Sequence, residues 1–192
     1  MQQASASRQP TLLWNLDREK LFGKFAFSNN PTPENPEGIK LLDDWAVKNL
    51  VKVSIAALPD AAQHGVELVQ FHRRVAPAFE ALLKAWGDAG VLDRILVWNG
   101  SYAPRYKRGR APGPKQPANA AYLSAHSWGS AFDVNARWNG LGHAPAAPGT
   151  VGSVWDLVEI AENLGWAWGG RWRVPDAMHF EATARCLSEG TT

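Results

Sequence analysis

Cysteine is almost absent from this chain, since Cys186 is the only one among 192 residues. An internal disulfide is therefore impossible, and a metal site built from several cysteines is excluded. Long apolar runs are missing as well, because no stretch approaches the roughly 18 consecutive apolar residues that suggest a membrane span. We therefore expect a fold held together by side-chain packing, with no insertion into a membrane.

Neither sign of charge dominates the chain, whose formal net charge is +2. Such a balance argues against a nucleic-acid-binding protein. The basic run at 105–115 contains no recognisable element for reading bases, so binding of a carboxylate or of an anionic surface explains it better. The first residues also lack the basic start and apolar stretch of a Sec signal, and we expect synthesis in the cytoplasm.

Tryptophan is abundant instead, with ten residues, and most of these indoles are expected to lie in a core or to line a groove. Residues 1–11 are interpreted as a flexible tail and 12–192 as a single domain. Apolar periodicity predicts helices at 40–51, 66–89 and 153–164, and strands at 94–98, 131–135, 166–168 and 177–181. Pro77, inside the second helix, argues for a kink or a late start. Helices followed by short strands indicate an α+β fold, with helices packed on a small antiparallel sheet.

The segment LSAHSWGSAFDVN (123–135) places a histidine close to a carboxylate. In the predicted strand, Asp133 shares one face with Ala131 and Asn135, while the apolar residues between them point into the core. His126 precedes a glycine-containing turn and can fold back onto the same face. The segment therefore directs two metal-binding groups toward one point.

A second segment, GGRWRVPDAMHFE, supplies further ligands. If MHFE is a strand, His179 and Glu181 share a face. Two imidazoles and a carboxylate suit Zn²⁺, which takes three protein ligands at a catalytic site and leaves one position for water. Asp176, three residues before His179, is then available to accept a proton from that water.

These motifs carry a family resemblance. The pattern SxH followed by G, A and D within 123–135, and then DxxH at 176–179, resembles the D-alanyl-D-alanine carboxypeptidase and L-alanyl-D-glutamate endopeptidase family. These VanY-like zinc peptidases include many phage endolysins. The resemblance covers about 94–181 and implies a fold like that of the hedgehog domain and the D-Ala-D-Ala peptidases. It also implies that His126, Asp133 and His179 bind Zn²⁺, with Asp176 as the general base.

The family usually carries an arginine in a Ser-Gly-Tyr-Arg type segment, where it steadies the substrate carbonyl oxygen or carboxylate. This sequence reads NGSYAPRYKRGR, with Ala-Pro inserted between Tyr102 and Arg105. Arg105 is the candidate for the role. The two-residue shift leaves Arg108 and Arg110 open as alternatives.

Other polar and aromatic residues near the motifs receive supporting roles. Ser124 is expected to form a hydrogen bond near the site, and Glu181 a hydrogen bond or ion pair beside a ligand. Trp128 is expected either to line the substrate groove or to pack in the core. His72 is interpreted as a core or surface residue, because a lone histidine is more often structural than a ligand.

The resemblance implies a zinc-dependent peptidase that acts on peptidoglycan stem peptides, in the cell wall or periplasm after release or secretion. An endolysin-like L-alanyl-D-glutamate endopeptidase is the first interpretation, and a D-alanyl-D-alanine carboxypeptidase is the alternative. A non-catalytic zinc-containing module that binds the cell wall is a third possibility, against which Asp176 argues. No nucleic acid and no obligate protein partner is expected.

Overall fold

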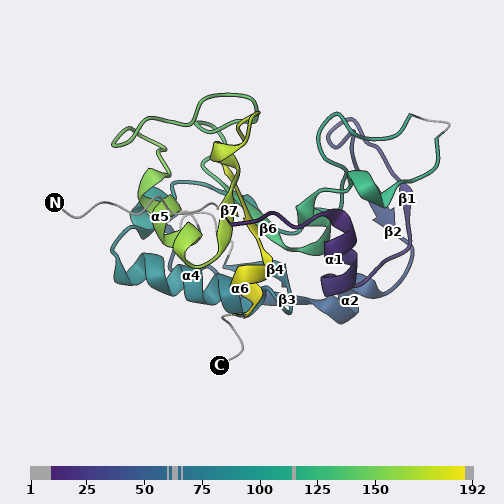
Figure 1. Cartoon of the computed structure of the whole chain (residues 1–192), viewed down its shortest axis with the longest axis horizontal. Helices are drawn as coiled ribbons and strands as arrows, with labels where there is room; N and C mark the ends of the chain where they lie inside the picture. Colours follow the sequence, from purple (N-terminus) through teal and green to yellow (C-terminus); the bar gives the residue numbers. More distant parts are fainter. Residues whose placement is uncertain (1–9, 60, 62–64, 66, 114–115, 189–192) are drawn as a thin grey trace.

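The structure, a computed structural model, describes residues 10–59, 61, 65, 67–113 and 116–188, and it has the expected α+β fold (Figure 1). The α-helices are α1 (Asn15–Phe22), α2 (Trp45–Asn49), α4 (Ala76–Asp88), α5 (Trp155–Asn163) and α6 (Ala184–Ser188). The strands are β1 (Phe27–Asn29), β2 (Ile39–Leu41), β3 (Leu50–Ser54), β4 (Leu68–His72), β5 (Trp98–Gly100), β6 (Ala131–Val134), β7 (Trp166–Trp168) and β8 (His179–Ala182). None of the helices in these ranges has the length and apolarity to cross a bilayer.

The central sheet has the strand order β5-β6-β8-β7, with every neighbouring pair antiparallel. Strands β1 and β2 form one separate ribbon, and β3 and β4 form another. In the β6–β8 pair, Phe132 lies opposite Phe180, and Asp133 lies opposite His179. Because side chains alternate between the two faces of a strand, one face of this pair is aromatic and the other carries polar groups.

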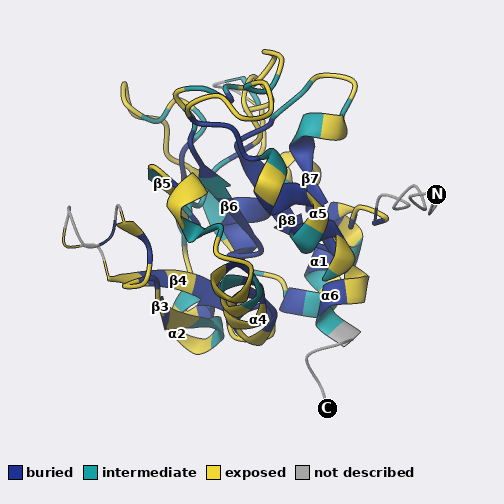
Figure 2. Cartoon of the chain, turned by 90° about the vertical axis from the view of Figure 1, so that its left-hand side faces the viewer, coloured by how far each residue is buried: buried dark blue, intermediate teal, exposed yellow. Residues whose placement is uncertain are grey.

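The aromatic face of the central sheet builds the core. Phe132 stacks on Phe180 with ring centroids 5.3 Å apart, and on Trp98 at 5.5 Å. Trp86 of α4 meets both phenylalanines edge-on and donates its indole N–H to the Leu157 carbonyl of α5. Figure 2 shows β6 and β8 as buried strands, surrounded by helices and loops that carry the exposed residues. This packing anchors the sheet from one side and leaves its polar face for a site.

The helix predicted at 66–89 was wrong in its first half. Leu68–His72 forms β4, in which Val69 and Phe71 are buried while Leu68 and Gln70 are exposed; Val66 lies outside the described residues. Helix α4 begins only at Ala76, with Pro77 in its first turn. In the first turn of a helix the backbone N–H groups have no helical carbonyl to bond to. A proline there loses no hydrogen bond, so it marks a helix start.

Two other predicted elements are shorter or displaced. The helix expected at 40–51 is reduced to α2, between strands β2 and β3. The strand expected at 94–98 begins only at Trp98, because Leu92–Arg94 forms a 3-10 helix. The predicted strand 166–168 coincides with β7, and the strand expected at 177–181 is β8, shifted toward the C-terminus.

The N-terminal segment packs beside the polar face of the central sheet. Residues 1–9 of the predicted tail lie outside the described residues, whereas Pro10 is already buried. In α1, the Asn15 side chain donates to the carbonyls of Ala120 and Leu123. These bonds hold α1 against the loop that leads to His126, and they bring Arg18 toward the central sheet.

Candidate metal centre and active site

Three predicted ligands converge on the polar face of the sheet. The Nδ1 atom of His179 lies 2.9 Å from Asp133 Oδ1. The Nε2 atom of His126 lies 3.2 Å from that oxygen and 3.1 Å from His179 Nδ1. The three donor atoms therefore form a nearly equilateral triangle, and the structure brings together residues that are up to 53 positions apart.

Local structure explains this convergence. Asp133 and His179 are direct partners across the β6–β8 pair, so their side chains leave the sheet side by side. His126 lies in the 3-10 helix η3 (Ala125–Trp128), which ends at Gly129 with a φ of 60°. A Cβ on Gly129 would lie 2.8 Å from the His72 backbone nitrogen, so this turn requires glycine for both its φ and its space.

The remaining ring nitrogens determine which tautomer each histidine adopts. His126 Nδ1 faces the carbonyl oxygen of Ser101, which can only accept, so Nδ1 carries the proton. His179 Nε2 lies 3.1 Å from Glu181 Oε2, and this carboxylate also accepts there. The two other ring nitrogens, His126 Nε2 and His179 Nδ1, both face Asp133 Oδ1 and are the atoms left to bind a metal ion. This is the arrangement by which outer hydrogen bonds orient metal-binding imidazoles.

The electrostatics of the triangle favour a cation. Burial would raise the pKa of Asp133, but the neighbouring His126 and His179 outweigh it and hold that pKa well below its usual range. Burial would lower the pKa of His179, but hydrogen bonds to Asp133 and Glu181 raise it to about 10. In the absence of a metal, positive charge at this point is thus strongly stabilised.

The donor set fits Zn²⁺. Zinc–nitrogen bonds of about 2.0–2.1 Å at a tetrahedral angle place neighbouring donor atoms about 3.3 Å apart, close to the three distances in the triangle. Nitrogen and carboxylate donors match the ligands that zinc takes at catalytic sites. A buried cluster of this composition can hold a metal ion, and His126, Asp133 and His179 are the residues that would do so.

Behind His179, Glu181 forms a buried ion pair whose partner, Arg18, the sequence did not reveal. Arg18 Nη2 is 2.7 Å from Glu181 Oε1, and the two side chains are 3% and 8% exposed. Arg18 also donates to the Leu13 carbonyl and to Asn15 Oδ1. Burial would raise the pKa of Glu181, but Arg18 and His179 lower it to about 2. Glu181 therefore remains ionised and can orient His179.

Asp176 lies beside the triangle on the loop before β8. Its backbone N–H donates to the Gly169 carbonyl, and its own carbonyl accepts from His179 N–H. The Asp176 Oδ1 atom is buried without a hydrogen-bond partner among the described residues. Burial is the main reason that the pKa of Asp176 is raised, with the His179 charge opposing it. A carboxylate with an unused acceptor and a raised pKa is suited to proton transfer.

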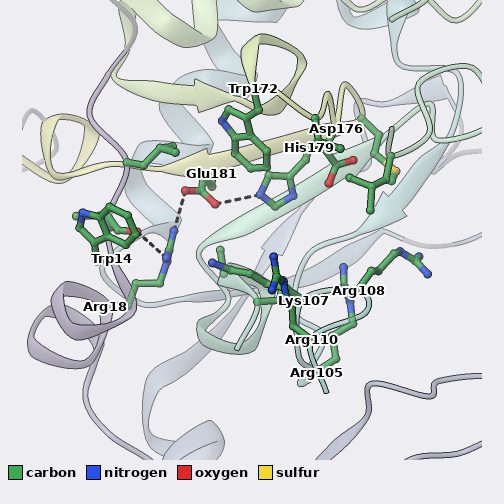
Figure 3. A pocket seen from close by; sticks show the side chains of 17 residues that line it. Trp14, Arg18, Arg105, Lys107, Arg108, Arg110, Trp172, Asp176, His179 and Glu181 are labelled. Atoms are coloured by element: carbon green, nitrogen blue, oxygen red, sulfur yellow. Dashed lines mark hydrogen bonds and ion pairs between the residues drawn. The ribbon is translucent and has the colours of Figure 1, made fainter. Parts of the chain in front are cut away.

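A cavity of about 510 Å³ opens in front of these residues and is lined by Asp176, His179, Glu181 and Trp172, among others (Figure 3). Arg105, Arg108 and Arg110, the three alternatives left by the sequence, all line it. Arg105 is half-buried, and its charge interacts with Asp133 and Asp176, whereas Arg108 and Arg110 are exposed. Position therefore favours Arg105 for contact with a reacting group.

The supporting residues fall in different places. Ser124 lines the cavity, and its Oγ accepts from the His126 backbone N–H at 3.4 Å. Trp128 does not line the described cavity: it is buried, packs against Phe25 and donates its indole N–H to the Gly23 carbonyl. Of the two roles expected for Trp128, the structure places it in the core.

Sequence reasoning missed two groups that orient the ligands. One is the Ser101 carbonyl. Every residue type has a backbone carbonyl, so the sequence gives no signal for this contact. The other is Arg18, for which the sequence offers only the spacing of three residues that places Asn15 and Arg18 on one face of a helix; the structure shows that both are buried. A buried arginine requires an anionic partner, and Glu181 supplies it.

The comparison with protein families agrees with this geometry. Residues 118–182 match the model of a family described as D-alanyl-D-alanine carboxypeptidase, which confirms the resemblance over that segment. Among curated proteins and solved structures, nothing matches the chain. The matched segment contains the three donors and Asp176, and it supports a peptidase that acts on peptidoglycan.

Proposed function

We propose that this chain is a zinc-dependent peptidase that hydrolyses peptidoglycan stem peptides. The observation that carries the proposal is the triangle of His126, Asp133 and His179 next to the unpartnered carboxylate oxygen of Asp176. Both features lie in the segment that matches the peptidase family and beside a cavity large enough for a peptide.

The chain's own groups suit amide hydrolysis. Bound Zn²⁺ supplies a Lewis acid and lowers the pKa of a water molecule to about 7. Asp176 accepts a proton from the attacking water and delivers it to the nitrogen of the departing peptide, which completes the breaking of the C–N bond. Arg105 donates hydrogen bonds to the carbonyl oxygen as that atom gains negative charge.

Two cleavage sites remain to be separated by experiment. We favour an endolysin-like endopeptidase that cuts between L-Ala and D-Glu in the cell wall or periplasm, with a D-alanyl-D-alanine carboxypeptidase as the alternative. Mass spectrometry of digested muropeptides distinguishes them. Release of whole stem peptides identifies the endopeptidase, and loss of one terminal alanine identifies the carboxypeptidase.

Replacement of Asp176 by Ala tests the proposed mechanism and the third alternative, a non-catalytic zinc-containing module. We expect turnover to fall by roughly 10²- to 10⁴-fold, because the proton acceptor is removed, while zinc content stays unchanged. The exposed Asp88 offers a matched control, since Asp88→Ala removes a carboxylate that does not line the cavity. Equal wall-lysing activity in Asp176→Ala and Asp88→Ala would contradict the mechanism.

A further inference from the structure

One side of the cavity carries an excess of positive charge. Among the described residues that line it, five are arginine or lysine, and two, Asp176 and Glu181, are carboxylates. Figure 3 shows Arg105, Lys107, Arg108 and Arg110 on the side of the cavity opposite Trp172, His179 and Asp176. We call Lys107, Arg108 and Arg110 the cationic wall.

The backbone of the cationic wall is fixed. The Lys107 N–H donates to the Tyr122 carbonyl, and the Arg110 N–H donates back to the Lys107 carbonyl to close a turn. Gly109 occupies this turn with a φ of 67°, and its N–H donates to Glu37 Oε1 at 3.1 Å. The buried Tyr106 next to the turn donates its hydroxyl to Asn29 Oδ1. The wall is thus an anchored turn that presents three cations.

The negative charge that would neutralise the wall is used elsewhere. Glu181 is occupied by Arg18 and His179, and Glu37 accepts from Gly109 while its charge acts on Arg105. Within the described part of the chain, none of Lys107, Arg108 and Arg110 forms an ion pair with a carboxylate. Burial lowers the pKa of Lys107 and the charge of Arg18 acts in the same direction, while the charge of Glu181 opposes both without forming an ion pair with Lys107. Cations held together in this way repel one another unless an anion enters from outside.

We propose that the cationic wall is a carboxylate-binding subsite, so that the peptidase selects stem peptides with free carboxylates over those in which the same groups are carboxamides. This inference rests on the proposed function. Arginine and lysine bind carboxylates through charge-assisted hydrogen bonds, which a neutral amide of the same shape cannot replace. The wall faces Asp176 and His179 across the cavity, so a bound peptide would present its amide to the metal centre and its carboxylates to the wall.

The test uses stem peptides that differ only at their carboxylates: one free, one with internal carboxylates amidated, and one amidated at the C-terminus. For the zinc-loaded protein we expect kcat/KM to be about tenfold higher for the free peptide than for at least one amidated form. The variant Lys107→Gln/Arg108→Gln/Arg110→Gln should reduce this ratio to near one. A ratio near one in the unaltered protein, or an unchanged ratio in the triple variant, overturns the proposal.

A matched control removes the same charge elsewhere. Lys48, Lys52 and Lys84 are exposed and do not line the cavity, so Lys48→Gln/Lys52→Gln/Lys84→Gln should keep the ratio of the unaltered protein. If no peptide is cleaved, the proposed function fails, but binding still tests the wall. Titration followed by tryptophan fluorescence should then show tighter binding of the free peptide, lost in the cationic-wall variant. Equal affinity for free and amidated peptides overturns the inference.

Discussion

His72 and His179 are both buried, with 1% and 6% of their surface exposed, yet their surroundings move their pKa values in opposite directions. Burial lowers the pKa of His72 to about 4, because its ring contacts Phe22 and Trp45 and bonds only to backbone groups. At His179 the carboxylates of Asp133 and Glu181 reverse the effect of burial. The surroundings of His72 disfavour a positive charge, and those of His179 stabilise one.

The comparison shows that the neighbouring groups, and not the degree of burial, distinguish a structural histidine from a metal-binding one. Both histidines occur next to buried apolar residues on strands, in QFHRR and in MHFEA. The Asp133 carboxylate that raises the pKa of His179 lies 46 residues away in the chain, and Phe22, whose ring helps to bury His72, lies 50 residues away. A lone histidine in a sequence is therefore ambiguous until its partners are known.

The largest expected effect comes from removing the two histidines in turn. His179→Ala should abolish zinc binding and lower turnover by about 10³-fold or more, because it removes a metal ligand. His72→Gln should retain zinc, since His72 lies outside the donor triangle. Metal analysis of both purified variants and a muropeptide digest measure this contrast. Stoichiometric zinc in His179→Ala would refute the assignment of the ligands.

A smaller effect on zinc affinity is expected when Glu181, the carboxylate partner of His179, loses its ion pair with Arg18. Arg18→Met leaves Glu181 without its buried cation, so zinc affinity should fall about 10- to 100-fold through misorientation of His179. Competition with a chromogenic chelator measures this affinity. Arg74→Met is the matched control, because Arg74 also anchors α1, through the Leu21 carbonyl, but has no carboxylate partner in the described structure. Equal affinity in the two variants would show that Arg18 does not position the ligand.

The smallest effect concerns stability and pH at His72. Its pKa of about 4 in the folded chain lies below the ordinary value of 6.5, so between these values the unfolded chain binds the additional proton. The free energy of unfolding should therefore fall as pH drops from about 6.5 to 4, by about 2 kcal/mol from this residue. Urea unfolding at pH 7 and pH 4.5 should show a smaller loss in His72→Gln than in the unaltered chain. An identical loss in both proteins would contradict this account.

Local patterns in the sequence sufficed for the part of the site that depends on strand geometry. Alternation in AFDV and HFEA placed Asp133 and His179 on the polar face, and the central sheet confirms both placements. Asn135, expected on the same face, instead leaves the strand with a φ of 55° and donates its side-chain amide to the Arg94 carbonyl.

The prediction of secondary structure was wrong where a segment fits both the helical and the strand periodicity. In the segment before Pro77, apolar residues fit a helix as well as the β4 strand, and the choice depends on pairing with β3. Arg18 and the Ser101 carbonyl escaped prediction because their roles exist only through tertiary contacts. Residue type alone cannot indicate a contact that another part of the chain creates.

The Arg18–Glu181 pair also has a consequence for how the protein matures. It joins residues 163 positions apart, so α1 leaves the ribosome long before its partner strand has been made. The nascent chain must keep a charged arginine hydrated until β8 arrives, and such a distant contact forms late because of the loop it closes. The three donor atoms of His126, Asp133 and His179 can therefore meet only after β8 has been synthesised, and the site stays incomplete until then.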